Sequence, residues 1–143
     1  MRILILCTGN AARSQMAEGF VRTYAPSVEV YSAGTAPAAS VHPFAVEVMK
    51  EVGIDISRQR PKGVEQFVRQ SFDFLITVCD NARETCPVFA GDVGHRLHLG
   101  FYDPAAARGG PEEVRGVFRQ VRDAMQIIFR EFSDRIMGSR QAS

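Results

Sequence analysis

The stretch LILCTGNAARSQMAEGF, residues 4–20, changes from a continuous apolar run into a pattern of helical period. Residues 3–6 contain no polar side chain, which is typical of a strand buried on both faces of a parallel sheet. From Ser14 onward, apolar residues recur at helical spacing until Pro26 ends the pattern. The stretch therefore predicts a buried strand, a tight loop and a helix in immediate succession.

The remainder of the chain continues this alternation. Further strands are predicted at 28–31, 74–78 and 96–99, a short helix at 64–68, and longer helices that begin at Pro43 and Pro111. Alternating strands and helices favour an open parallel sheet with helices on both faces. We therefore predict an α/β fold with about four strands, formed by a single domain over residues 1–143.

Composition limits the class of protein further. The chain has 143 residues, of which 45% are hydrophobic and 23% charged, and a net charge of +1, the balance of an ordinary globular domain. It has neither the basic surplus of a general nucleic-acid binder nor an apolar run of membrane-spanning length. Its first apolar run is too short for a signal peptide, and an odd number of cysteines is typical of a reducing compartment. We expect a soluble cytoplasmic protein that binds neither nucleic acid nor membranes.

Three segments capable of chemistry directly follow predicted strands. Cys7 follows the first strand, Cys79 the third, and residues 100–104 the fourth. In open parallel sheets, ligands bind beyond the carboxyl ends of the strands. The three segments are therefore expected to lie together on one rim of the molecule.

The loop after the first strand has the features of an oxyanion site. Successive loop N–H groups and the N-terminus of a helix together form a cradle for an anion. Gly9 allows close approach of the backbone, Asn10 tolerates unusual backbone angles, and Arg13 offers a planar fork to two oxygens. The predicted oxyanion-binding residues are Thr8, Gly9, Asn10, Ala11, Ala12, Arg13 and Ser14.

Cys7 is the predicted nucleophile of this site. A thiolate is favoured beside a helix N-terminus and a cation, and Ser14 is placed to donate a hydrogen bond to it. An activated sulfur that faces a bound oxyanion is the arrangement that covalent catalysis requires. The structural alternative is an inert cysteine at the end of a strand, with Arg13 on a solvated helix face.

Asp103 is the predicted general acid. Displacement at an oxyanion expels a poor leaving group, which has to receive a proton. Asp103 lies in the loop after the fourth strand, on the rim that also carries Cys7. Asp103-Pro104 is also a common way to open a turn, so the structural explanation stays open.

Cys79 and Cys86 raise a geometric question. In a helix their Cα atoms would stand about 10 Å apart, whereas a disulfide needs roughly 5.5 Å. The two cysteines can therefore join only if the segment between them unwinds. Several residues in or beside this segment disfavour a helix: Asp80, Asn81, Thr85 and Pro87. Two structural thiols are the alternative.

No metal site is predicted. The spacing of Cys79 and Cys86 is not that of a zinc site, and the three histidines are interpreted as non-ligands. The number of cysteines bears instead on redox chemistry. A phosphatase needs one thiolate, whereas two-electron reduction of an oxyanion needs two thiols that end as a disulfide, and a third that carries the disulfide outward.

Five segments in order resemble one known family: CTGNAARSQMAEGF, YSAGT, HPFAVEVMKEVGIDIS, VCDNARETC and GFYDPAA. They are similar to the thioredoxin-coupled arsenate reductases, which share the fold of the low-molecular-weight protein tyrosine phosphatases. The resemblance covers the chain from its first residues to Arg122 and implies a flavodoxin-like strand order. The Cys-x5-Arg-Ser loop is common to both branches, whereas Cys79, Cys86 and the Ala105-Ala106 pair favour the reductases.

The resemblance implies a cysteine relay that reduces arsenate to arsenite without a cofactor. Cys7 would attack arsenate, of which phosphate and sulfate are analogues, and Asp103 would protonate the departing hydroxide. Cys79 would then attack Cys7 and release arsenite, and Cys86 would resolve the Cys7–Cys79 disulfide. Thioredoxin would reduce the resulting Cys79–Cys86 disulfide, and we expect the protein to be a monomer.

The chain departs from its relatives at the loop. Ala11 stands where many relatives have serine, and Ala12 stands where many have a cysteine. The second change leaves Cys79 as the only evident partner for Cys7.

A second departure concerns potassium. Some relatives bind potassium near the loop through a Thr-Ser-Asp stretch, and this chain reads Arg60-Pro61-Lys62 there. Because Lys62 would replace the acidic ligand, we predict no potassium site, although Asn10, Glu18 and Ser32 remain.

Two other functions remain open. One is a low-molecular-weight protein tyrosine phosphatase that hydrolyses phosphate monoesters through a phosphocysteine at Cys7. The other is a flavin or phosphoryl carrier that uses the loop without catalysis. Ala11 and Ala12, in place of hydroxyl residues, and the absence of tryptophan disfavour the flavin carrier.

Overall fold

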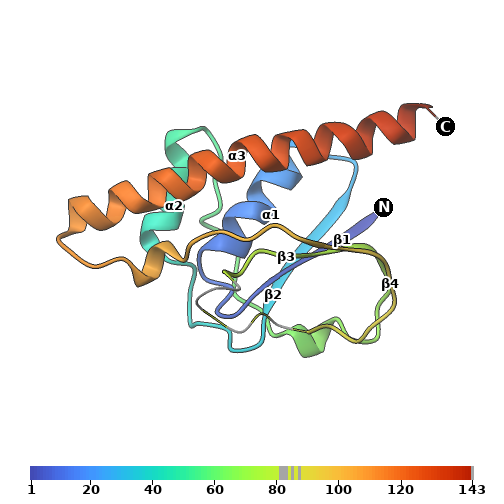
Figure 1. The fold of residues 1–143 in the computed structure, drawn as a ribbon, viewed down its shortest axis with the longest axis horizontal. Helices are drawn as coiled ribbons and strands as arrows, with labels where there is room; N and C mark the ends of the chain where they lie inside the picture. Colours follow the sequence, from blue (N-terminus) through green and yellow to red (C-terminus); the bar gives the residue numbers. More distant parts are fainter. Residues whose placement is uncertain (81–83, 85, 87, 143) are drawn as a thin grey trace.

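The computed structural model describes residues 1–80, 84, 86 and 88–142, and these residues form a four-stranded sheet. The strands are β1 (Arg2–Cys7), β2 (Glu29–Gly34), β3 (Phe72–Thr77) and β4 (Val93–His98). All pair in parallel, in the order β2-β1-β3-β4, with β1 between β2 and β3 (Figure 1). The parallel α/β fold and its flavodoxin-like strand order are confirmed.

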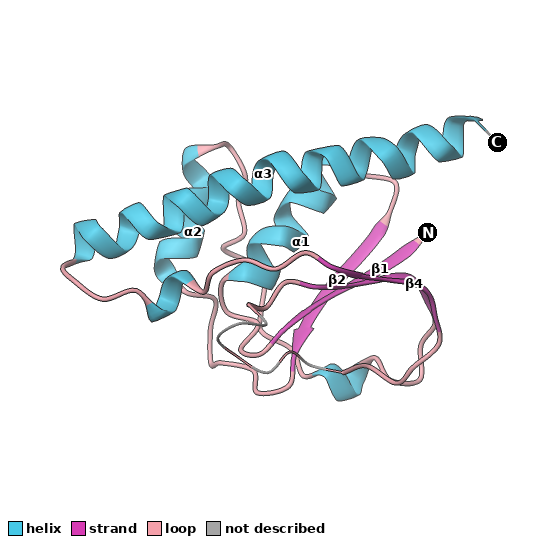
Figure 2. Cartoon of the chain, in the orientation of Figure 1, coloured by secondary structure: helices cyan, strands magenta, loops and turns pink. Residues whose placement is uncertain are grey.

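Three α-helices pack over one face of this sheet (Figure 2). They are α1 (Arg13–Tyr24), α2 (Pro43–Glu51) and α3 (Pro111–Ala142). Ile3 and Ile5 of β1 share one apolar cluster with Phe20 of α1 and Phe118 of α3, and all four side chains are fully buried. Fully burying such side chains contributes about 1.5–3 kcal/mol each, so this cluster is what fixes α1 against the sheet.

The opposite face of the sheet has a thinner cover. Leu4 and Leu6 point there and pack with Phe67, Phe72 and Phe89. In the part of the chain that the structure describes, the helix on this side is η1 (Val64–Gln66), a single 3₁₀ turn. The predicted helix at 64–68 is therefore shorter than expected, and the cover is made mainly by aromatic rings from loops.

The edge strand β4 begins three residues earlier than the sequence pattern indicates, at Val93. Gly94 and His95 are weak strand formers, and pairing with β3 is what makes this segment extended. The His95 ring stacks on Phe74 at 5.1 Å between centroids, which gives the strand a side-chain contact as well.

Charged side chains join α2 to α3. Glu51 at the end of α2 accepts hydrogen bonds from Arg119 and Arg122 of α3. Hydrogen bonds from Arg119 lower the pKa of Glu51 to about 2, with a further contribution from Arg122.

Over the described residues, no helix is both long and apolar enough to cross a bilayer.

His42 connects the helical layer to the loop after β1. Its Nδ1 accepts a hydrogen bond from the Phe44 amide at 3.1 Å and so caps α2. Its own amide donates to the Ala11 carbonyl at 2.8 Å, and its ring packs on Phe118. Burial lowers the pKa of His42, and the charge of Asp103 acts in the opposite direction. The native state therefore favours the neutral ring.

The lowered pKa of His42 predicts a pH-dependent contribution to stability. The contribution is present above the unfolded pKa of about 6.5 and is lost as the pH falls through the lower folded value. We expect His42→Asn, which keeps a capping oxygen without a titrating group, to flatten the decline in Tm between about pH 8 and pH 5 by about 2 °C. Thermal melts of both proteins across this range measure the effect, and parallel profiles would contradict it.

Candidate active site

The loop between β1 and α1 lies at the carboxyl end of the central strand. Cys7 is the last residue of β1 and is 2% exposed, and Arg13 is the first residue of α1. Ala12 occupies the N-cap position and makes no side-chain hydrogen bond to the helix. Because a serine or aspartate at that position would bind a first-turn amide itself, Ala12 leaves the helix N-terminus to a ligand.

The carbonyl groups of this loop are turned outward. Three of them accept hydrogen bonds from backbone amides of the segment after β2, at 2.8–3.0 Å: Thr8 from Ala36, Gly9 from Ala38, and Ala11 from His42. In a trans peptide the N–H points opposite to the carbonyl that precedes it. The following amides are thereby directed to the other side, and the Asn10 amide donates to Cys7 Sγ at 3.2 Å. The loop is a cradle of N–H donors around the cysteine.

Asn10 holds this loop in shape. It is fully buried, and its φ of 49° lies in the left-handed region, which asparagine tolerates better than most residues. Its Oδ1 accepts from the Lys62 amide at 2.8 Å and from Gln15 Nε2 at 3.0 Å. Its Nδ2 donates to Ser14 Oγ at 2.7 Å. One side chain thus ties together the loop, the helix and the segment after α2.

Ser14 is oriented toward Cys7 by the same interaction. Its Oγ lies 2.8 Å from Cys7 Sγ and accepts the Asn10 Nδ2 hydrogen bond. Because an Oγ that accepts from Asn10 keeps its own proton available, the hydroxyl is set to donate to the sulfur. Cys7 Sγ then receives two hydrogen bonds, one from the Ser14 hydroxyl and one from the Asn10 amide.

Gly34 at the end of β2 lies against the loop. A Cβ at this position would overlap the Thr8 carbonyl and stand 3.0 Å from the Asn10 amide nitrogen. Both neighbours are backbone atoms of the cradle, so the site can accept a side chain only if the loop moves.

We therefore expect Gly34→Ala to destabilise the protein by about 1–3 kcal/mol and to weaken phosphate binding at the loop. Gly116→Ala, in α3, is the matched control, because a Cβ there meets nothing within 4 Å. Denaturant unfolding and phosphate titration measure the two effects. If the two variants have the same stability and the same phosphate affinity, the close packing of Gly34 on the loop does not matter for folding or for binding.

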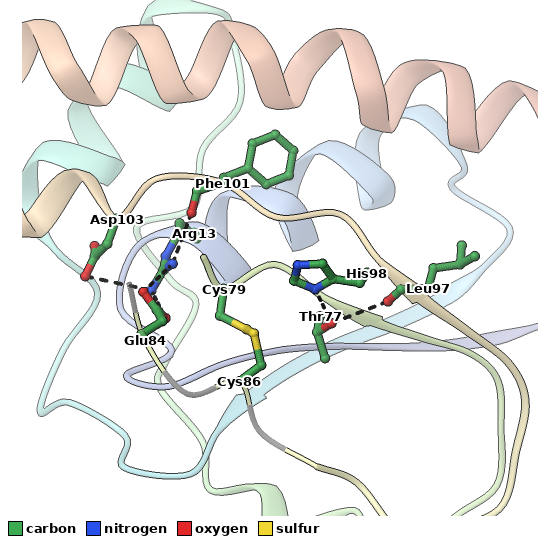
Figure 3. The surroundings of a disulfide bond; sticks show 9 residues. All are labelled: Arg13, Thr77, Cys79, Glu84, Cys86, Leu97, His98, Phe101 and Asp103. Atoms are coloured by element: carbon green, nitrogen blue, oxygen red, sulfur yellow. Dashed lines mark hydrogen bonds and ion pairs between the residues drawn. A yellow bond between two sulfur atoms is a disulfide. The ribbon is translucent and has the colours of Figure 1, made fainter. Parts of the chain in front are cut away.

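Arg13 extends toward the other loops of the rim. Its side chain is 5% exposed, and its Nη1 donates to the Phe101 carbonyl at 3.1 Å. Both terminal nitrogens bind the carboxylate of Glu84, Nη1 to Oε2 at 2.9 Å and Nη2 to Oε1 at 2.8 Å (Figure 3). Burial acts to lower the pKa of Arg13, but the hydrogen bond to Glu84 and the charges of Asp103, Glu84 and Cys7 outweigh it and raise the pKa.

Asp103 lies beside the same guanidinium. Its Oδ2 is 3.8 Å from Arg13 Nη2, and its Oδ1 accepts from the Ala105 amide at 3.0 Å. The second contact caps η2 (Pro104–Ala106), which begins at the proline of the Asp-Pro pair. Asp103 therefore both opens a turn, through Oδ1, and lies on the predicted rim, where Oδ2 faces Arg13.

The two remaining cysteines form a disulfide beside this group. Cys79, two residues after the end of β3, is fully buried, and its Cα lies 5.7 Å from that of Cys86. Cys7 is free and buried. The spacing is about half that of a continuous helix, in agreement with the geometric argument from sequence. Of the residues expected to disfavour a helix there, Asn81, Thr85 and Pro87 lie outside the described residues.

His98 is a neighbour that the sequence did not indicate. It pairs with Thr77 across the sheet, and its Nδ1 lies 2.8 Å from Thr77 Oγ1. One ring nitrogen and the sulfurs of Cys79 and Cys86 all lie within 4.8 Å of one another. Because the two sulfurs are bonded to each other, neither is a free thiolate in this form, and the absence of a metal site stays a prediction.

Lys62 lies where the potassium prediction placed it. Its Nζ is 3.8 Å from Glu18 Oε1 and donates to the Arg60 carbonyl at 2.8 Å. Glu18 is 3% exposed and also binds Ser32 Oγ and Arg22. Burial lowers the pKa of Lys62, while the charge of Glu18 raises it and that of Arg22 lowers it further. With two side-chain cations already at Glu18, these residues do not fit a potassium ion.

We accordingly expect Tm and activity to be equal in potassium and sodium chloride at the same concentration. Lys62→Asp removes the ammonium and restores an acidic group, so this variant is expected to gain a potassium-specific rise in Tm. Lys62→Met, which removes the charge alone, is the control. A potassium response in the unmodified protein would show the prediction to be wrong.

The predicted site residues fall into two groups. Cys7, the loop and Arg13 form the cradle, with Asp103 beside Arg13, as the strand ends indicated. The Cys79–Cys86 disulfide lies beside Arg13 and Glu84, as Figure 3 shows. Glu84, the Phe101 carbonyl and His98 were missed. Glu84 stands in the quoted motif VCDNARETC, but nothing in its spacing marks it as a partner of Arg13.

Fold and site together describe an α/β protein with a free, buried cysteine in the loop that joins its central strand to a helix. Residues 2–139 match the family described as low molecular weight phosphotyrosine protein phosphatase, and the chain belongs to this family.

Similar proteins are named for a second reaction. An arsenate reductase of Halalkalibacterium halodurans is 44% identical over 133 residues, which cover 92% of this chain and 94% of the relative. A solved arsenate reductase in its reduced state is 30% identical with a TM-score of 0.75, and one in its oxidised state is 29% identical with a TM-score of 0.75. Each of these alignments covers 94% of this chain and 98% of the solved one.

Proposed function

We propose that the protein reduces arsenate to arsenite by a relay of its three cysteines. The observation that carries the proposal is the Cys79–Cys86 disulfide beside a cradle whose own cysteine, Cys7, is free. This is the state in which the proposed relay ends, with the oxidised pair moved away from the nucleophile. The similarity to arsenate reductases with distinct reduced and oxidised states supports it.

The first step is attack of the Cys7 thiolate on arsenate. Arg13 and the loop amides of residues 8–14 hold the oxyanion and spread its charge over fixed donors. The expelled oxygen needs a proton, and Asp103, 3.8 Å from Arg13 Nη2, is the proposed source. The products are a Cys7–arsenic bond with arsenic still in its oxidised state, and water.

The second step transfers two electrons. The Cys79 thiolate attacks Cys7 Sγ, a Cys7–Cys79 disulfide forms, and the pair of the broken sulfur–arsenic bond leaves with arsenic as arsenite. Cys86 then attacks Cys79, frees Cys7 and leaves the Cys79–Cys86 disulfide. We propose thioredoxin as the dithiol that reduces this bond, in a monomeric protein of the cytoplasm.

The same cradle suits hydrolysis of phosphate monoesters. Water in place of Cys79 would complete that reaction from a phosphocysteine at Cys7. Membership of the phosphatase family favours this as a second activity. The two reactions differ in their need for Cys79, and this difference separates them experimentally.

Arsenate-dependent oxidation of NADPH, coupled through thioredoxin and its reductase, tests the relay. We expect sustained turnover by the unmodified protein, none by Cys7→Ser or Cys79→Ser, and at most one turnover per molecule by Cys86→Ser. The last variant stops because the Cys7–Cys79 disulfide has no resolving thiol.

Hydrolysis of an aryl phosphate by the same variants is the control. It should be lost in Cys7→Ser and retained in Cys79→Ser, which also shows that the second variant keeps its loop intact. Sustained arsenate turnover by Cys86→Ser would refute the relay. Aryl-phosphate hydrolysis as fast as arsenate turnover in the unmodified protein would favour a phosphatase instead.

A further inference from the structure

Glu84 occupies the arginine fork of the oxyanion site. Its two carboxylate oxygens bind Arg13 Nη1 and Nη2 at 2.9 and 2.8 Å, the paired geometry with which arginine binds an oxyanion. The Arg13 side chain is 5% exposed and that of Glu84 is 22% exposed. A pair of this kind, with little access for water, is screened far less than an ion pair at the surface.

The contact takes up one of the two edges of the guanidinium on which a pair of parallel N–H groups meets. Glu84 binds the edge formed by Nη1 and Nη2, and Nη1 also donates to the Phe101 carbonyl. The edge formed by Nε and the second N–H of Nη2 is the one that an external anion can use. A divalent oxyanion at the cradle would in addition face the negative charge of Glu84 at short range.

The position of Glu84 is tied to the disulfide. It lies two residues before Cys86, inside the loop that the Cys79–Cys86 bond closes. Its amide donates to the Asp80 carbonyl at 2.9 Å, within the same loop. The Cα atoms of Cys79 and Cys86 stand 5.7 Å apart here, and no covalent bond holds them at that distance once the disulfide is reduced. Because Glu84 lies between the two cysteines, its position is expected to change when they separate.

We propose that Glu84 is an internal ligand of the oxyanion site, which occupies the Nη1 and Nη2 edge of Arg13 when Cys79 and Cys86 are joined and leaves it when they are reduced. The group it competes with is a tetrahedral oxyanion of the arsenate and phosphate class. The inference deepens the proposed function and rests on it only for its role in turnover, since the competition for Arg13 is a property of binding.

The role in turnover follows from the chemistry of Cys7. In the disulfide form Cys7 is still a free thiol, but Cys79 is not available to attack it. Arsenate bound at that moment would give a Cys7 adduct with no thiol to complete the reduction. A carboxylate on Arg13 weakens the binding of arsenate until the pair has been reduced, because it takes up two donors and adds a negative charge. Its departure then favours binding of the next substrate.

Thermodynamic linkage makes the effect reciprocal. If the reduced protein binds phosphate more tightly than the disulfide form, phosphate must favour the reduced state by the same factor. A tenfold ratio of dissociation constants corresponds to a rise of about 30 mV in the potential of this two-electron couple at saturating phosphate. The two measurements are independent and have to agree.

Phosphate titration of the two redox forms tests the proposal. Thiol counting identifies the disulfide form, with one free thiol, and the form reduced by dithiothreitol, with three. Calorimetry on the unmodified protein is expected to give a phosphate affinity about tenfold or more higher in the reduced form. In Glu84→Gln the disulfide form is expected to bind phosphate as tightly as the reduced form, and phosphate should no longer shift the potential.

Two further variants separate occupation of the fork from a general effect of charge. Glu84→Asp keeps the charge but is too short for the same paired contact, so it should behave like Glu84→Gln if occupation matters. Glu131→Gln makes the same change in net charge within an exposed pair on α3 and should behave like the unmodified protein.

Equal phosphate affinity in the two redox forms of the unmodified protein would overturn the proposal, as would a difference that persists in both Glu84 variants. These results do not depend on arsenate turnover. If the protein shows the Glu84-dependent difference in phosphate affinity but reduces no arsenate, the proposed function is refuted and the internal ligand stands. If it reduces arsenate but shows no such difference, the internal ligand is refuted and the proposed function stands.

Discussion

The outward turn of three carbonyl groups in the loop after β1 is the constraint on which the site depends. A row of N–H donors that faces one point is costly unless a partner occupies that point, because each buried donor without a hydrogen bond costs about 1–3 kcal/mol. The loop adopts this arrangement because Ala36, Ala38 and His42 bind its carbonyls from outside and Asn10 holds its left-handed turn. The segment after β2 thus determines the direction of the donors without contacting an anion itself.

The charges around Arg13 follow from that arrangement. The cradle and the guanidinium create a positive site in a place with little water, and such a site attracts whichever anion can reach it. Two carboxylates of the chain do so, Asp103 at 3.8 Å and Glu84 in direct contact. They differ in what holds them. Asp103 is fixed by the start of η2, whereas Glu84 lies between two cysteines joined by a disulfide. Under the proposal, the first acid is a permanent neighbour of the site and the second a neighbour only in the disulfide form.

The sequence predicts the fold well because a parallel sheet constrains it strongly. Residues 3–6 are buried on both faces, so they read as an unbroken apolar run, and the order of the strands places Cys7, Cys79 and Asp103 on one rim. What the sequence could not indicate depends on loops that meet in space. Glu84 is a glutamate in a polar stretch with no periodic pattern, and its partner lies 71 positions away. Helices were predicted on both faces of the sheet, but among the described residues the second face carries only the short turn η1. Nothing in the sequence marks Phe67 and Phe89 as rings that loops would hold against the sheet.

The opening loop alone leaves the reaction undecided, since a thiolate, an arginine and a row of amides serve hydrolysis and reduction equally well. The decision lies in how a second thiol reaches the first. Ala12 removes one such thiol from the loop, and Cys79 offers another, two residues after β3 ends beside the central strand. The segment after Cys79 then has to satisfy two demands, to bring Cys86 to Cys79 and to leave the rim open for substrate. The proposed role of Glu84 connects the two demands, because a residue between the two cysteines that binds Arg13 would link the state of the disulfide to the anion site.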